Sequence, residues 1–207
     1  MLWSQPSAEA QAAAIADDIA YDAHDIDDGL RADLFSLAAL EDVPLVAELR
    51  RDLYARHPRL EIARVNSGLV RRLIARMIDD VTAESKRRLS AAAPRSAEAV
   101  RAAGAALIGF SAEMAAADAS IKRFLRDHMY RHPRILRIMD AAQDVVRNLF
   151  VHFLACPHDL PSEWTQNLDL ADEAGRARRS ADFIAGMTDR YALAEHARHF
   201  DTTPELV

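Results

Sequence analysis

Apolar side chains recur every three or four residues along almost the whole chain, and this helical period constrains the fold more than any other feature of the sequence. Strictly alternating polar and apolar runs, which are typical of strands, are few. The Asp-Gly pair that ends at Gly29 follows a helical pattern, so it indicates the tail of a helix and not a hairpin turn. We therefore predict an all-α protein built as a bundle of several helices.

Proline residues divide the chain into predicted helices, because proline can begin a helix but interrupts one that is already formed. The predicted helices cover about residues 7–30, 44–57, 60–91, 111–132, 134–156 and 175–199, with a short helical piece between 94 and 109. Residues 157–173 form the predicted loop, which Trp164 attaches to the body of the protein.

Gly186 falls inside the last predicted helix, where glycine costs about 1 kcal/mol of helix stability relative to alanine. Close packing against another helix is the favoured explanation for Gly186, and close approach of a ligand is the alternative.

Composition excludes several classes of protein. The chain is 50% apolar, which is too much for a disordered segment, and no apolar run reaches the length of about 18 residues that a membrane span needs. The first residues lack the pattern of a secretory signal, so we expect a cytoplasmic protein with no membrane partner. The sequence shows no repeat and no clear linker, and we expect one all-α unit over residues 1–207.

The formal net charge of −6 argues against bulk binding of nucleic acid, which requires a basic surface. Binding of single-stranded DNA in a local basic pocket is the alternative that this charge leaves.

Histidine and cysteine offer weak signals for a metal site. His24 and His158 each precede an aspartate, but neither pair has further ligands at a useful spacing, and we expect His158 to be structural or exposed. Cys156 is the chain's one cysteine, which excludes an internal disulfide, and its simplest interpretation is a small buried apolar side chain.

An acidic edge stands out in the first predicted helix. Asp17, Tyr21 and Asp25 are four residues apart, so they line one edge of the helix next to its apolar stripe. Carboxylates at the boundary of a core are costly to desolvate unless they are paired or bind a cation. This pattern favours a metal or sugar-hydroxyl site, and an acidic solvent face is the alternative.

A basic edge with the same spacing lies in the helix that precedes Pro133. It consists of Lys122, Arg126 and Tyr130. Two cations and a phenol on one edge are suited to a polyphosphate and the flat face of a sugar, because cations pair with phosphate oxygens and an aromatic ring packs on apolar surface. The alternative is an ordinary surface face with a half-buried tyrosine.

Three segments together resemble a known family. Residues 16–25 read Ala-Asp-Asp-Ile-Ala-Tyr-x-x-His-Asp and are followed by Asp-Asp-Gly-Leu-Arg, residues 122–133 read Lys-Arg-Phe-Leu-x-x-x-x-Tyr-Arg-His-Pro, and residues 182–192 read Asp-Phe-Ile-Ala-Gly-Met-Thr-Asp-Arg-Tyr-Ala. Their sequence, order and distances are similar to those of the bacterial dGTPase-like enzymes, which are HD-domain deoxynucleoside triphosphate triphosphohydrolases. The resemblance covers essentially all of the chain and implies the C-terminal portion of an HD-domain-like helical bundle.

The resemblance also implies roles for individual residues. Family members hold a divalent metal through two His and two Asp, and Asp17 matches the later Asp of that set. Tyr21 matches a tyrosine at the phosphates, and Lys122 matches a basic phosphate contact. Asp25 matches a carboxylate that contacts the sugar 3′-hydroxyl, and Tyr130 matches the tyrosine that packs against the deoxyribose and leaves no room for a 2′-hydroxyl.

Arg126 and His132 match polar positions of the family's pocket with less specific roles. Residues 1–31 then correspond to the last block of the metal-binding HD domain, and residues 32–207 correspond to the helical part that follows it. The dNTP substrate would be cleaved to a deoxynucleoside and triphosphate, and the resemblance implies a homo-oligomer.

The sequence departs from the family at one point. The family's early His and its His-Asp pair lie upstream of the block that begins here near Glu9, so we expect the chain to match the C-terminal half of a longer protein. No catalytic residue is then assigned to this chain, and a single carboxylate does not hold a divalent ion such as Mg²⁺ or Mn²⁺ against water. We expect the isolated chain to be inactive and to retain no metal. The alternative is a non-catalytic helical module that binds nucleotide or joins hetero-oligomers.

Overall fold

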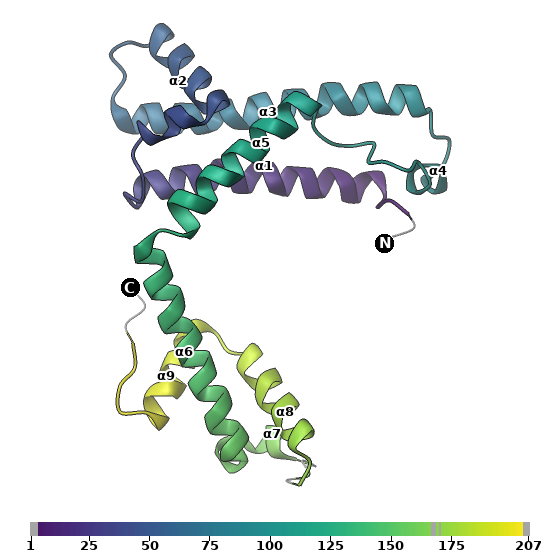
Figure 1. Ribbon diagram of the computed structural model, residues 1–207. Coiled ribbons are helices and arrows are strands. Elements are labelled where there is room, and N and C mark those ends of the chain that lie inside the picture. Colours follow the sequence, from purple (N-terminus) through teal and green to yellow (C-terminus); the bar gives the residue numbers. More distant parts are fainter. Residues whose placement is uncertain (1–3, 167–168, 170, 205–207) are drawn as a thin grey trace. The chain divides into compact units, whose positions relative to one another are not determined.

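The computed structural model describes residues 4–166, 169 and 171–204, and within these ranges the chain forms helices and no strand (Figure 1). The all-α prediction is confirmed. The contacts divide the chain into two compact units, residues 1–132 and 133–207. The expectation of a single unit stays a prediction, because a division by contacts does not measure whether the two parts fold separately.

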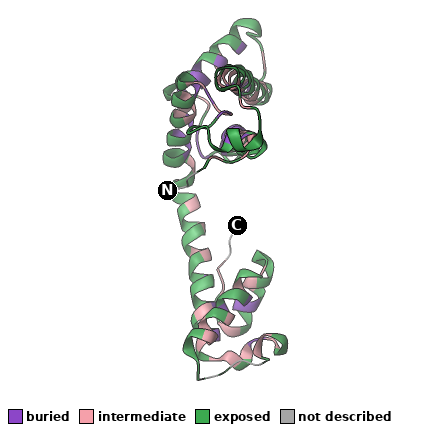
Figure 2. Cartoon of the chain, turned by 90° about the vertical axis from the view of Figure 1, so that its right-hand side faces the viewer, coloured by how far each residue is buried: buried purple, intermediate pink, exposed green. Residues whose placement is uncertain are grey.

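The first unit is built on two long helices, α1 (Ala8–Arg31) and α3 (Ile62–Ala92), which pack along one another. Helix α2 (Pro44–Arg56) packs on α3, and α5 (Ala112–Leu125) runs obliquely past α1 (Figure 1). The shorter pieces of this unit are the 3-10 turn η1 (Ala39–Asp42), α4 (Ala97–Arg101) and the π turn η2 (Arg126–Tyr130). Figure 2 shows exposed residues along the outer faces of these helices.

Local sequence explains where these helices begin. Ser7 precedes α1, and its hydroxyl accepts a hydrogen bond from the backbone N–H of Ala10 at 3.3 Å. Pro44 occupies the first position of α2, where its missing N–H has no partner to lose. Ser111 caps α5 in the same way as Ser7 caps α1, through the N–H of Met114 at 3.1 Å. The predicted starts of these helices are therefore confirmed to within one or two residues.

The second unit contains α6 (Pro133–Ala155), the 3-10 turn η3 (Pro157–Asp159), α7 (Ser162–Thr165), α8 (Glu173–Ala185) and α9 (Asp189–His199). Helices α8 and α9 both pack on α6. The core of the unit consists of Val145, Leu149, Phe153, Leu160 and Phe183. Trp164 packs against this core with its ring 5.4 Å from that of Phe183, so the predicted role of Trp164 is confirmed.

Two expectations about the last helix were wrong. Residues 175–199 form two helices and not one, because α8 ends at Ala185 and the hydroxyl of Thr188 caps α9 by accepting from the N–H of Tyr191 at 3.4 Å. Gly186 is the residue that follows α8, and a methyl group placed there would meet only the backbone oxygens of α8, the nearest at 3.5 Å. Gly186 thus ends a helix and does not admit a packing partner.

Apolar residues at helical spacing are buried along α3 from Val65 to Met77, but Ile62 is 71% exposed at the first turn of the helix. No helix in the described part of the chain is both long enough and apolar enough to cross a bilayer.

Candidate functional site

The acidic edge of α1 and the basic edge, which runs from Lys122 on α5 to Tyr130 on η2, meet within the first unit. The hydroxyl of Tyr130 donates a hydrogen bond to Oδ2 of Asp25. Nearer the middle of α1, the Lys122 ammonium lies 3.2 Å from Oδ1 of Asp18 and 3.0 Å from Oδ1 of Asp118. The edges lie far apart in the sequence, so their meeting is a tertiary arrangement that the spacing within each helix does not dictate.

The π turn η2 positions Tyr130. Helix α5 ends at Leu125, and the chain then widens, so that the N–H of Arg131 bonds to the carbonyl oxygen of Arg126 at 3.0 Å. A π turn shifts the side chains that follow relative to the helical pattern, and such turns are frequent at functional sites. Tyr130 reaches α1 from this turn, whereas the exposed Arg126 guanidinium bonds to Asp127 at 3.0 Å.

Lys122 is held as a cation. Burial opposes its charge, but hydrogen bonds to Asp118 and Asp18 outweigh burial and raise the pKa of the Lys122 ammonium above its usual value. Both carboxylates lie in reach of the same ammonium group. An incoming anion could replace the half-exposed Asp18 as a partner of Lys122 without leaving the ammonium unpaired, because Asp118 stays bound.

Tyr130 is held as a neutral phenol. Partial burial and the adjacent Asp25 carboxylate raise the pKa of the Tyr130 hydroxyl well above its usual value. Tyr130 as a whole residue is nevertheless 48% exposed, so part of it is open to contact with a ligand while the hydroxyl stays bonded to Asp25.

Asp22 is a buried carboxyl group below this edge, and the sequence analysis missed it. It is 2% exposed, and within the described residues its Oδ2 has no hydrogen-bond partner. Burial, followed by the hydrogen bond and charge of Asp118, raises the pKa of Asp22 to about 8. The sequence did contain a signal, since Asp22 lies between Ile19 and Ile26 at helical spacing and therefore falls on the apolar stripe.

The remaining predicted residues lie at or near the surface. Asp17 is exposed on α1, Tyr21 is 62% exposed one turn later, and His132 is half-buried at the end of the first unit. Among the described residues, the histidine, cysteine and carboxylate side chains that come together as potential metal ligands lie in the second unit, and Asp17 does not belong to such a group. Asp17 alone does not fit a complete divalent-metal site, because such sites need about four ligands from protein or substrate.

The surface formed by Asp25, Lys122 and Tyr130 has groups suited to bind a polar ligand, but the described residues on it do not form a reaction centre. It offers an ammonium for a phosphate oxygen, a carboxylate that can accept from a hydroxyl group, and a half-exposed aromatic ring. The exposed Tyr21 and Asp17 extend the same edge of α1 toward its beginning. The geometry therefore supports a wall of a polar binding site.

Comparison with known proteins supports a phosphohydrolase-type helical domain. Residues 108–198, somewhat less than half of the chain, match the model of the phosphohydrolase-associated domain.

Curated relatives then make the similarity more specific. The chain is 55% identical over 205 residues, 99% of its length, to the "Deoxyguanosinetriphosphate triphosphohydrolase-like protein" of Azorhizobium caulinodans, of which it covers 51%. Proteins of the same name from Rhodopseudomonas palustris and Brucella anthropi are 55% and 50% identical over 99% and 97% of the chain, with 51% and 50% of their own lengths covered. The chain matches the C-terminal half of these dGTPase-like proteins at 50–55% identity, and it spans about half of their length.

Proposed function

We propose that this chain forms one wall of the substrate site of a deoxynucleoside triphosphate triphosphohydrolase, an enzyme that converts a dNTP and water to a deoxynucleoside and triphosphate. One observation carries the proposal. Residues that the family resemblance assigns to the phosphates and to the sugar come from α1 and from the end of α5, and they meet through the Tyr130–Asp25 hydrogen bond and the Lys122 ion pairs.

Each residue has a role that suits its surroundings. Lys122 would bind a phosphate oxygen in place of Asp18 while Asp118 continues to neutralise it. Asp25, already bonded to Tyr130, would accept a hydrogen bond from the sugar 3′-hydroxyl. The half-exposed Tyr130 would lie against the deoxyribose and, as the family resemblance implies, would leave no room for a 2′-hydroxyl. Tyr21 extends from α1 toward the phosphates, and Arg126 and His132 would line the outer part of the pocket.

The divalent metal of this family would supply the polarisation of the phosphate and the activation of water. Asp17 is the one residue of this chain assigned to it, and its exposed carboxylate does not fit a complete site. The residues of this chain bind and orient the nucleotide.

The proposal is tested with the chain alone and with a chimera. Alone, the chain should release no triphosphate from any dNTP in Mg²⁺ or Mn²⁺. Joined to the matching first half of the Azorhizobium caulinodans relative, it should release triphosphate and deoxynucleoside. Turnover by the chimera should be lost in Asp17→Ala and fall at least tenfold in Lys122→Gln, whereas Arg123→Gln, which removes a neighbouring exposed cation of α5, should retain it.

Two results would contradict the proposal. Robust turnover by the isolated chain that is lost in Asp17→Ala would mean that the chain is a complete enzyme. A chimera whose turnover is insensitive to Lys122→Gln would mean that α5 does not contact the substrate.

A second candidate is a non-catalytic module that binds nucleotide or joins hetero-oligomers with a longer relative. The observation that favours it is the isolation of Asp17 from other metal ligands among the described residues. Binding of a dNTP to the isolated chain without turnover, together with co-purification with a full-length relative that alters that relative's activity, would support this candidate. The homo-oligomer implied by the family is also a proposal, and sedimentation of the chimera tests it.

A further inference from the structure

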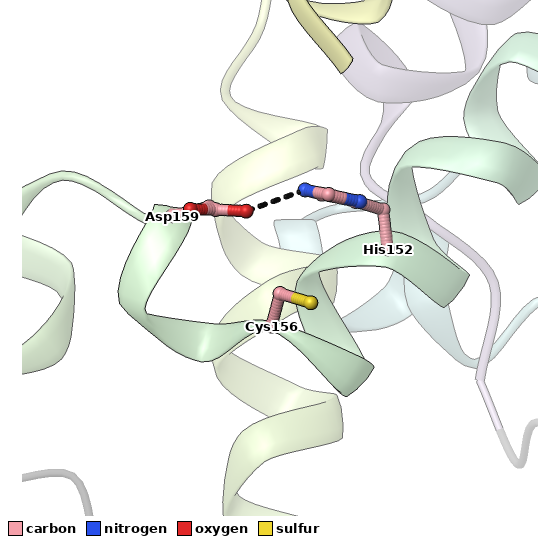
Figure 3. A group of neighbouring side chains, drawn as sticks. All are labelled: His152, Cys156 and Asp159. Atoms are coloured by element: carbon pink, nitrogen blue, oxygen red, sulfur yellow. Dashed lines mark hydrogen bonds and ion pairs between the residues drawn. The ribbon is translucent and has the colours of Figure 1, made fainter. Parts of the chain in front are cut away.

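The end of α6 carries a cluster of three potential metal ligands that the family resemblance does not assign. His152, Cys156 and Asp159 each offer one ligand atom, and these atoms all lie within 4.8 Å of one another (Figure 3). Cys156 is the residue that follows α6, and its N–H bonds to the carbonyl oxygen of His152 at 2.8 Å, which keeps the two residues close together at the end of the helix. Nε2 of His152 and Oδ2 of Asp159 are 2.8 Å apart.

The backbone holds the third ligand in place. Pro157 ends α6 and begins η3, and the N–H of Asp159 bonds to the carbonyl oxygen of Cys156 at 3.0 Å, which turns the Asp159 carboxylate back toward the helix. The next residue, Leu160, is 4% exposed in the core of the second unit. The turn is therefore anchored at both ends, and the ligands need little ordering when an ion binds.

Aromatic packing fixes the His152 ring. Its centroid lies 4.1 Å from that of His199, and the rings of Phe153 and Phe200 contact its edges at 5.5 and 5.8 Å. Oε1 of the buried Glu195 lies 3.2 Å from Nε2 of His199, which holds that neighbouring ring in turn. A ligand whose orientation is fixed by its neighbours binds a metal more tightly, because less side-chain freedom is lost.

The ligand chemistry selects the ion. One imidazole nitrogen, one thiolate sulfur and one carboxylate oxygen form a mixed set typical of Zn²⁺, whereas Mg²⁺ and Ca²⁺ prefer oxygen ligands alone. Ligand atoms in a tetrahedral zinc site are separated by roughly 3 to 4 Å, since zinc–ligand distances are about 2.0 to 2.3 Å. Small rotations of the three side chains bring them to this spacing, and the His152–Asp159 hydrogen bond is exchanged for two bonds to the ion.

We propose that His152, Cys156 and Asp159 bind one Zn²⁺ ion, which fastens the turn η3 to the end of α6. A water molecule or the exposed His158, whose Nε2 lies 3.7 Å from Oδ1 of Asp159, completes the coordination. A hydrogen bond between His152 and Asp159 accounts for those two side chains by itself. The sulfur atom beside them is the additional feature that a metal site explains.

Cys156 makes the test specific, because it is the chain's one cysteine. After the chain is treated with a chelator and reducing agent, its reaction with a thiol-specific disulfide reagent is followed with and without Zn²⁺. Micromolar Zn²⁺ should slow the reaction at least tenfold in the parent chain and should have little effect in His152→Gln or Asp159→Asn. His24→Gln, which removes an exposed histidine of α1, should behave as the parent does.

Co²⁺ provides a second, spectroscopic readout. The parent chain should show a thiolate-to-cobalt charge-transfer band in the near ultraviolet that Zn²⁺ displaces, and Cys156→Ser should lack it while its far-ultraviolet circular dichroism is unchanged. The proposal is overturned if the parent chain gives no such band, if protection of Cys156 requires millimolar Zn²⁺, or if His152→Gln and Asp159→Asn are protected as well as the parent. If Cys156→Ser fails to fold, the two other variants decide the question through the thiol reaction.

Discussion

The buried Asp22 carboxyl group makes stability depend on pH. Its pKa rises from an ordinary value of 3.8 to about 8 on folding, chiefly through burial and then through the neighbouring Asp118. The folded chain therefore binds a proton at Asp22 that the unfolded chain has released, and stability falls as pH rises between these two values. The stability associated with protonated Asp22 is fully present below the unfolded pKa and is lost as pH rises through the folded pKa.

We predict that Asp22→Asn removes this dependence. The amide has the shape of the protonated acid but cannot ionise, so the variant should be close to the parent in acid and more stable than it in alkali. Urea unfolding should show a difference within about 1 kcal/mol at about pH 4, close to the unfolded pKa, and a gain of several kcal/mol at about pH 9, since each unit of pKa shift corresponds to about 1.4 kcal/mol.

Asp28→Asn is the matched control, because Asp28 is an exposed residue of the same helix. Its free energy of unfolding should differ from that of the parent by the same small amount at both pH values. Parallel pH profiles for the parent and Asp22→Asn would show that Asp22 is ionised, or solvated, in the folded chain.

Gly29 is required by packing within the first unit. A methyl group added there would overlap the ring of Phe35, which is itself buried and packed edge-on against Phe124 at 5.0 Å between centroids. We predict that Gly29→Ala destabilises the chain by about 1–3 kcal/mol, because overpacking outweighs the better helix propensity of alanine. Gly186→Ala, with room for its methyl group, should stay within about 1 kcal/mol of the parent in the same thermal or urea unfolding measurement. Equal effects of the two substitutions would contradict this account.

At the scale of the element, the hydroxyl of Ser111 and its neighbour Asp80 tie the start of α5 to α3. Both the N–H and the hydroxyl of Ser111 donate to the Asp80 carboxylate, at 2.9 and 2.7 Å, while the same hydroxyl accepts from Met114. This start sets the course of the helix that carries Lys122 to α1.

We predict that Ser111→Ala costs about 1–2 kcal/mol of stability, because a helix cap and a hydrogen bond to a charged group are lost together. Ser96→Ala removes the cap of the short helix α4, an exposed bond to the N–H of Ala99 at 3.2 Å, and should cost about half as much. Urea unfolding of both variants measures the difference. A cost for Ser111→Ala no larger than that for Ser96→Ala would mean that the Asp80 contacts add nothing.

Helix boundaries were predictable wherever a proline or a capping serine marks them. Pro44 begins α2 and Pro157 ends α6, because the missing N–H and the ring of proline act locally. The break between α8 and α9 was not predicted, since Gly186 and Thr188 are each tolerated inside a helix and only their combined geometry ends one helix and caps the next. The π turn η2 was missed for a similar reason, because a widened turn leaves no periodic signal in so few residues.

The candidate site was predictable as two separate edges and no further. Spacing placed Asp25 and Tyr130 each on an edge of its own helix, but the hydrogen bond between them depends on how α5 crosses α1. Asp118 was missed because its role comes from the ion pair with Lys122 and from the proximity of Asp22, which are tertiary contacts. His152 was missed because its partners are brought together by the turn after Pro157.

At the scale of the whole molecule, the chain spans about half of its relatives and exposes an apolar hollow between α1 and α3. The hollow has a volume of about 480 Å³, and its apolar lining includes Ile15, Ile19, Ile74, Ile78, Val81 and Leu89. Ile15 lies one turn before the buried Ile19 on the apolar face of α1, yet it is only half-buried. Exposed apolar surface of this kind drives association unless other residues cover it, and we expect residues of the relatives' other half to cover it in the longer proteins.

We predict that the isolated chain self-associates through this hollow and that one charge in it prevents the association. Ile78 is 47% exposed on the rim, so Ile78→Glu should fold normally while making the apolar surface costly to bury against a second copy. Ile62→Glu places the same charge on the same helix outside the hollow, at a side chain that is 71% exposed, and should leave association unchanged. Size-exclusion chromatography should give species larger than 23.0 kDa for the parent and for Ile62→Glu, and the monomer for Ile78→Glu.

Binding of an apolar fluorescent dye should fall in Ile78→Glu alone, which separates association through the hollow from an oligomer formed elsewhere on the chain. A parent chain that elutes as a clean monomer and binds no dye would show that the hollow is closed in solution, because an open apolar face of this kind cannot be inert to both probes.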